Sequence, residues 1–134
     1  MSEFDYIKLV EYLNKYETQK RINKLSKKYK RKRIVLFGAG QFAQVLFQNF
    51  DLSQLNIIAI SDKKFEQEGV QEFFGLNCVK PNDLKKMTYD VILISNLDYK
   101  KFVNILDEKI LYGTENAGVE IRPLINLDFK NILG

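Results

Sequence analysis

An apolar run that leads directly into a glycine-rich turn constrains the fold of this chain more than any other feature. Ile34–Phe37 contains only β-branched and large apolar residues, which is typical of a buried strand. Gly38, Ala39 and Gly40 follow at once, and Gln41–Phe50 has the apolar spacing of a helix. The chain therefore passes from strand to helix through a tight turn, as parallel α/β domains do.

Four further strands are expected along the sequence. Asn56–Ser61 and Asp90–Ser95 are apolar almost throughout, and shorter strands are expected at Asn77–Val79 and Gly118–Arg122. Helical patterns separate them, and buried strands separated by helices indicate a parallel sheet covered on both faces. The expected fold is α/β, a Rossmann-type three-layer domain with a parallel sheet in the order 3-2-1-4-5.

Residues 1–31 are expected to form an N-terminal helical arm, followed by the α/β domain at 32–134. Apolar residues recur at three-residue steps from Phe4 to Tyr16, which is helical spacing. The polar stretch Glu17–Gln19 leaves open whether the arm is one helix or two. The apolar stripe also predicts a homodimer formed through this N-terminal helix.

The composition excludes several classes of chemistry. The 134 residues include no histidine and one cysteine, which excludes histidine triads, histidine bases and His/Cys metal clusters. No metal site is expected, and no catalytic acid/base pair emerges. No apolar run reaches the length of a membrane span, and the N-terminus lacks the layout of a signal peptide. We therefore expect a cytoplasmic protein.

The glycine turn matches the G-x-G-x-x-G/A dinucleotide fingerprint in the place that its mechanism requires. The first glycine permits the tight turn, the second lets a phosphate approach the backbone, and the small third residue lets the helix pack closely. Open N–H groups and the helix dipole favour an anion there. The expected cofactor-binding residues are Gly38, Ala39, Gly40, Gln41, Phe42 and Ala43. A tight turn that binds nothing is the alternative.

Polar residues follow two of the other strands. Asp62 ends the second strand, where the fingerprint places an acid that accepts hydrogen bonds from ribose hydroxyls. That carboxylate favours NAD(H) over NADP(H), although Lys63 and Lys64 could neutralise a 2′-phosphate. Of these two lysines, Lys63 is expected at the binding site together with Asp62. The alternative is that Asp62 caps the next turn. Ser95 and Asn96 are expected to line the far side of the crevice, with an Asx turn as their alternative.

The positive charge of the chain is concentrated in one segment. Residues 20–33 hold nine basic residues and no acidic one, and six of the seven residues in Lys27–Arg33 are basic. Contact with nucleic acid, contact with a membrane surface, a solvated helix end, and a field that draws phosphates to Gly38–Gly40 are all open interpretations. The first two are less favoured than the others, and nucleic acid has little support because Tyr29 is the only aromatic residue in the cluster.

Segments in four places together look like a known group of domains. They are Arg33–Ala43, Ile60–Asp62, Gly75–Leu84 and Tyr89–Ser95. They resemble the Rossmann-like nucleotide-binding domains of bacterial surface-polysaccharide enzymes. In the sugar-nucleotide epimerase/dehydratase relatives the glycine turn holds NAD, and in the sugar acetyltransferase relatives the similar domain holds a UDP-sugar. By this resemblance, NAD(H) or a UDP-type nucleotide sugar is bound by Gly38, Gly40, Ala43 and Asp62.

The chain departs from both groups because it lacks their catalytic parts. The Tyr-x-x-x-Lys spacing occurs only at Tyr16–Lys20, ahead of the glycine turn, and no catalytic histidine or left-handed helix repeat is present. We expect the binding module alone, serving sugar-nucleotide metabolism for surface polysaccharides. Two alternatives stay open. One is an NAD-dependent epimerase, dehydratase or oxidoreductase that acts with a partner domain. The other is an assembly or nucleic-acid-contacting protein that uses residues 27–33.

Overall fold

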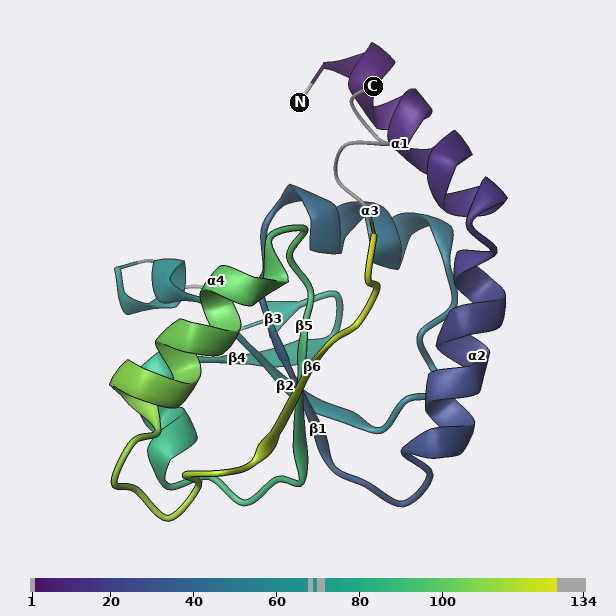
Figure 1. Cartoon of the computed structure of the whole chain (residues 1–134). Coiled ribbons are helices and arrows are strands. Elements are labelled where there is room, and N and C mark those ends of the chain that lie inside the picture. The colour runs from purple at the N-terminus through teal and green to yellow at the C-terminus, as the bar shows by residue number, and fades with distance from the viewer. Residues whose placement is uncertain (1, 68, 70–71, 128–134) are drawn as a thin grey trace.

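A mostly parallel sheet forms the centre of the computed structural model, which describes residues 2–67, 69 and 72–127. Its order is β3-β4-β2-β1-β5-β6 (Figure 1), so β3 and β6 are the edge strands. Neighbouring strands are parallel except β3 and β4, which are antiparallel. The strands are β1 Ile34–Phe37, β2 Ile57–Ser61, β3 Glu72–Phe73, β4 Leu76–Val79, β5 Val91–Ile94 and β6 Glu120–Pro123.

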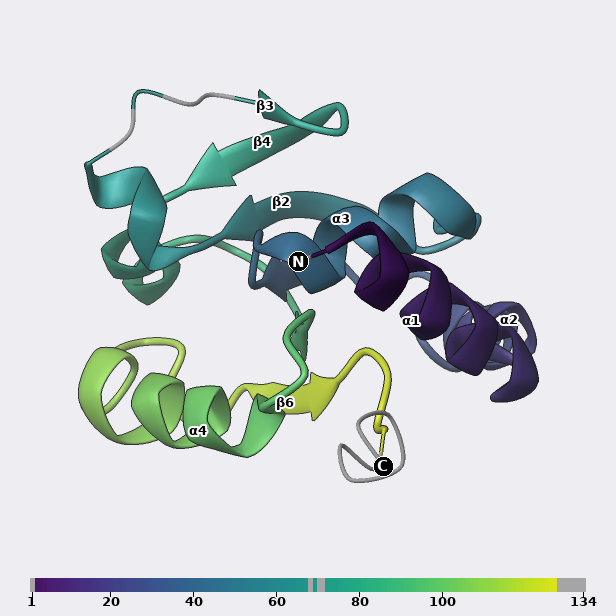
Figure 2. The same cartoon turned by 90° about the horizontal axis from the view of Figure 1, so that it is seen from above.

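Helices cover both faces of this sheet, as Figures 1 and 2 show from two directions. One face packs against α1, α2 and α3, and the other packs against α4 and the helical turns η2 and η3. The helical elements are α1 Glu3–Lys15, α2 Thr18–Lys28, α3 Gln41–Asn49, η1 Lys63–Glu66, η2 Pro81–Lys85, α4 Tyr99–Asn104 and η3 Ile105–Ile110. None of those described is long and apolar enough to cross a membrane.

The alternation of side chains along β1 explains why its sequence is apolar throughout. Ile34 and Leu36 belong to the cluster under α1–α3, whereas Val35 and Phe37 belong to the cluster under α4 and η3. Successive strand residues point to opposite faces, so a strand covered on both sides needs an apolar residue at every position. The expected α/β class with a covered, mainly parallel sheet is confirmed.

The strand order differs from the expected 3-2-1-4-5 because a hairpin adds the edge strand β3. Phe74 and Gly75 connect β3 to β4, and both have positive φ angles, 49° and 81°. Two-residue hairpin turns favour such angles, but an aromatic residue rarely adopts them. Contacts with α3 hold the turn, because the Phe47 ring stacks on Phe74 at 5.2 Å and meets Phe73 edge-on at 5.9 Å.

The N-terminal segment forms two helices that pack on the α/β part. The chain breaks between α1 and α2 at Glu17, which has a left-handed φ of 59°. Leu13 and Ile22 are fully buried in the same cluster as α3. The apolar stripe expected to form a dimer therefore packs partly within its own chain, and Phe4 and Ile7 keep 72% and 50% of their surface exposed.

Two of the helical segments between the strands are irregular. A short α-helix and the π-helical turn η3 follow β5, and the segment after β4 is the 3-10 turn η2. After β6, Leu124, Ile125 and Leu127 are buried in the core. Residues 128–134 lie outside the described part of the chain.

Candidate functional site

The carboxyl ends of β1, β2 and β5 meet at the glycine turn, and hydrogen bonds fix its first residue. The Gly38 N–H donates to the Ser61 carbonyl at 2.8 Å. Gly38 has a φ of +121°, and an added Cβ would collide with the Asn96 amide and lie 3.0 Å from the Ser95 carbonyl oxygen. Backbone conformation and close packing both require glycine at this position.

Gly40 is different, because neither reason for a glycine applies to it. It is the N-cap residue of α3, with an extended backbone (φ −89°, ψ −159°), and no side chain caps the helix there. Nothing lies within 4 Å of an added Cβ. No side chain therefore covers the first N–H groups of the helix, which lie at the positive end of its dipole.

The residues that follow Gly40 divide into a buried pair and an exposed one. Phe42 and Ala43 are buried in the core, and Phe42 keeps only 6% of its surface exposed, so its side chain cannot meet a ligand. Ala43 has no exposed surface, in agreement with the close helix packing that a small residue permits. Gln41 is exposed in the first turn of α3.

Asp62 braces the turn from the end of β2. Its carboxylate accepts a hydrogen bond from the Ala39 N–H at 2.7 Å and another from the Lys64 N–H at 3.0 Å. The second bond makes Asp62 the N-cap of η1, so the capping alternative left open by the sequence is present. A carboxylate has about four acceptor positions, so room remains for a ribose hydroxyl.

Lys64, rather than Lys63, reaches the glycine turn. The Lys64 ammonium donates to the Ala39 carbonyl and lies 5.8 Å from the ring centroid of Phe65 and 5.6 Å from that of Phe73. Lys63, the residue expected at the site, is exposed and makes no hydrogen bond within the described part of the chain. Successive residues of a helical turn point in different directions, so the exact start of η1 determines which lysine faces the glycine turn. The sequence does not show where that turn starts.

Ser95 and Asn96 lie beside the turn, as expected, but their polar groups serve the backbone. The buried Ser95 hydroxyl donates to the Gly38 carbonyl at 2.6 Å. The Asn96 amide donates to the Phe37 carbonyl at 3.4 Å and occupies the space that the absent Gly38 side chain leaves. Both residues hold the end of β5 against the turn. The open donors of the site are therefore those at the start of α3.

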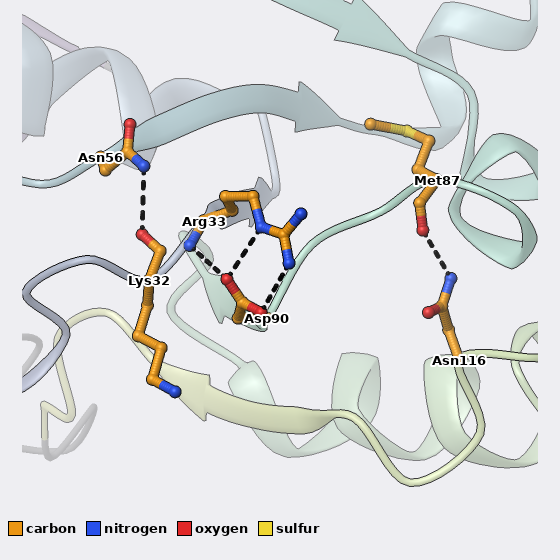
Figure 3. Close-up of polar contacts among 6 residues, drawn as sticks. All are labelled: Lys32, Arg33, Asn56, Met87, Asp90 and Asn116. Carbon is orange, nitrogen blue, oxygen red and sulfur yellow. Dashed lines mark hydrogen bonds and ion pairs between the residues drawn. The ribbon is translucent and has the colours of Figure 1, made fainter.

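The basic segment ends where the parallel strands begin, which we call the amino edge of the sheet, opposite the carboxyl ends that hold the glycine turn (Figure 3). Arg33 donates to the Asp90 carboxylate from Nε, from Nη2 and from its backbone N–H, at 3.0, 3.0 and 2.7 Å. These bonds lower the pKa of Asp90 to about 2. Arg33 and Gly38 are separated by the length of β1, about 16 Å of extended chain, which exceeds the Debye length in physiological salt. The segment therefore contributes little field at the glycine turn.

Two amide side chains complete this amino edge. The Asn56 amide donates to the Lys32 carbonyl at 3.3 Å, and the Asn116 amide donates to the Met87 carbonyl at 2.9 Å (Figure 3). Each contact ties a loop to the connection next to it. Among the described residues, no group of three His, Cys, Asp or Glu side chains is placed to hold a metal ion at either edge.

Comparison with known proteins identifies the family of the chain. No curated protein matches the sequence. No solved structure matches it either. A protein family described as C2185-like, N-terminal, matches residues 29–110, which is more than half of the chain and includes the glycine turn, Asp62, Ser95 and Asn96. The chain therefore belongs to the C2185-like, N-terminal family.

Proposed function

We propose that this chain is a nucleotide-binding module of Rossmann type, and that its glycine turn binds the phosphate of NAD(H) or of a UDP-type nucleotide sugar. Parallel α/β sheets bind ligands at the carboxyl ends of their strands, where the first strand-to-helix turn receives the phosphate. The glycine turn of this chain lies at that edge, between β2 and β5. Asp62 at the end of β2 is the proposed ribose contact, and Ser95 and Asn96 form the opposite wall.

One observation carries the proposal, which is the open space at Gly40. Its backbone angles suit any residue, and Ser, Asp or Asn at this N-cap position would stabilise the helix better than glycine. A side chain there would cover the N–H groups that an anion needs. Access for a phosphate is therefore the reason for glycine that remains.

The resemblance to polysaccharide enzymes supplies the proposed context. The module would serve bacterial surface-polysaccharide or sugar-nucleotide metabolism in the cytoplasm, either as an accessory protein or with a partner that performs the chemistry. The Ser95 hydroxyl is already bonded to the Gly38 carbonyl, so it is a poor candidate for an acid or a base. A homodimer through the exposed Phe4 and Ile7 of α1 belongs to the same proposal.

Calorimetry with NAD⁺, NADH and a UDP-sugar tests the proposal, after native mass spectrometry of the freshly purified protein for a retained ligand. Gly40→Asp should weaken binding about tenfold or more, because a carboxylate would stand where the phosphate binds. Gly40→Asn has the same shape without the charge and should lose less affinity. Gln54→Glu adds the same charge in the loop before β2, at the amino edge, and should leave binding unchanged.

Three results would count against this function. Neither heat nor a thermal shift with any of the three ligands would end the proposal. Equal losses in Gly40→Asp and Gln54→Glu would show an effect of net charge rather than a site. Turnover of NADH with a sugar nucleotide by the protein alone would place the chain among the enzymes.

A further inference from the structure

A second open feature lies where α2 meets the segment after β6. A groove of about 270 Å³ runs between them. Arg21, Lys24 and Lys28 line one wall, the segment 123–126 forms the other, and Leu25 lies between the cations. Leu25 of α2 packs against the core cluster that contains Leu124 and Ile125, on the face of the sheet that α1, α2 and α3 cover (Figure 1). The groove is separate from the glycine turn and shares no residue with it.

The cations of this groove stand on one face of α2. Residues 21, 24 and 28 follow the i, i+3, i+7 spacing of a helical stripe and span about 10 Å along the axis. All three are exposed, and none has an ion-pair partner among the described residues. No acidic residue occurs within Thr18–Lys28, and none of the described residues that line the groove is acidic. The described part of the chain therefore gives the groove a positive potential.

One of these cations is already held in place. The Arg21 guanidinium lies 3.8 Å from the ring centroid of Tyr16, and its Nε donates to the Tyr16 carbonyl at 2.8 Å. The Tyr16 hydroxyl in turn donates to the Asn126 carbonyl, which joins the two walls. The terminal amino groups of Arg21 remain open to an anion. A fixed guanidinium loses less side-chain entropy on binding than a free one.

We propose that this groove binds a short acidic peptide segment of a partner protein, with its carboxylates on Arg21, Lys24 and Lys28 and an apolar side chain against Leu25. Carboxylates on alternate residues of an extended peptide lie on one side of the chain and are about 7 Å apart. Two of them therefore fit within the stripe, which is about 10 Å long. This inference does not depend on the function proposed for the glycine turn.

Single-stranded nucleic acid fits the groove less well, because bases need a free aromatic face. Tyr16 is the aromatic residue of the groove, and Arg21 covers one face of its ring. Tyr12 lies nearly parallel to it, at a centroid distance of 6.4 Å. A groove with cations and an apolar residue but no stacking platform favours carboxylates beside an aliphatic side chain over phosphates beside bases.

Selection from a displayed library of random peptides tests the proposal without knowledge of the partner. The wild-type chain should enrich peptides that combine Asp or Glu with an aliphatic residue. Synthetic versions of these peptides should bind Lys24→Glu/Lys28→Glu about tenfold or more weakly. The control Lys30→Glu/Lys32→Glu makes the same charge change outside the groove and should change affinity about twofold or less. Thermal unfolding of both variants checks their folding, and Lys24→Gln/Lys28→Gln repeats the test without new negative charge.

Several outcomes would overturn the inference. Enrichment of peptides that lack acidic residues would contradict the proposal that the groove binds an acidic peptide, and so would a selection that enriches no peptide. Equal losses in both charge-reversed variants would reduce the effect to net charge. Tighter binding of oligo(dT) than of any selected peptide, abolished by Lys24→Glu/Lys28→Glu alone, would assign the groove to nucleic acid. A mass that falls from dimer to monomer in that variant would make the occupant a second copy.

Discussion

At the amino edge of the sheet the polar side chains bind one another, whereas at the carboxyl edge some backbone donors are left open. Arg33 and Asp90 form a two-pronged ion pair that a backbone N–H strengthens. Asp62 and Lys64 form an equally ordered set around Ala39, but the N-terminus of α3 beside them has no side-chain cap. A basic and an acidic side chain thus bind each other at the amino edge. At the carboxyl edge a similar pair binds the backbone beside the uncapped start of α3.

The presence of uncapped backbone donors distinguishes a binding edge from a structural one more clearly than the number of charges does. The amino edge has the greater positive charge, yet its arginine is paired and its amides tie neighbouring loops together. The carboxyl edge has fewer charges but holds Gly40, where neither the backbone conformation nor close packing requires glycine. Uncapped backbone N–H groups beside well-ordered residues therefore indicate a binding site better than a local excess of positive charge does.

The largest expected effect comes from the two glycines of the turn. Gly38→Ala should lower the free energy of unfolding by about 2 kcal/mol or more, because of its positive φ and the collision with Asn96. Gly40→Asn should change it by a few tenths of a kcal/mol in the stabilising direction. Urea denaturation of both variants measures this contrast, and equal destabilisation would show that both glycines are structural.

Asp62→Asn should have the next largest effect. The amide keeps one oxygen and turns an NH₂ group toward one of the two backbone donors, Ala39 or Lys64. One donor then loses its acceptor, which costs about 1–2 kcal/mol in a partly buried place. Chemical denaturation measures the loss. No loss of stability would mean that Asp62 does not brace the turn and is free for a ligand.

Asp90→Asn should have a smaller effect, because solvent screens this pair, and the effect should depend on pH. The pKa of Asp90 in the folded protein is lowered to about 2, mainly by the hydrogen bonds from Arg33. A carboxyl group with a lowered pKa stabilises the folded state at every pH above its ordinary, unfolded-state pKa. This contribution is lost as the pH falls through the folded-state pKa of about 2. The stability difference between wild type and Asp90→Asn should be full at pH 6, should shrink below pH 4 and should vanish below pH 2. A constant difference would contradict the pairing.

The smallest expected effect lies in the connection between α2 and β1. Arg31 has a left-handed φ of 70°, which costs a residue with a side chain about 1 kcal/mol more than glycine. Arg31→Gly should therefore raise the stability slightly, by about 0.5 kcal/mol, while nucleotide affinity stays the same. Thermal unfolding and calorimetry on one preparation check both statements. A loss of affinity would extend the binding site to the amino edge.

The parts of the fold that depend on buried runs were predictable from the sequence. Strands covered on both faces need apolar residues throughout, so β1, β2 and β5 were located to within a residue or two. The hairpin at Phe73–Gly75 was missed because β3 has only two residues, too few to show the alternation of a strand. Its conformation depends on stacking against Phe47, which lies in a distant part of the sequence.

The candidate site was predictable as a set of positions but not as a set of roles. The fingerprint located Gly38 and Gly40, and only the structure distinguishes the glycine that the fold needs from the one that it does not. Lys64 was passed over for its neighbour Lys63, since one residue changes the direction of a side chain in a helical turn. The groove of α2 was missed because a count of charges does not show which of them share a face.

The two edge strands of the sheet have a consequence for how the chain behaves at high concentration. Pro123 ends β6 and has no N–H to offer, and the exposed residues Glu120 and Arg122 add charge to that edge. At the other end, β3 pairs over only two residues. Short, charged or proline-containing edges do not template the addition of a strand from another molecule. Concentrated solutions of this protein should therefore stay free of cross-β aggregates, even though nearly half of its residues are hydrophobic.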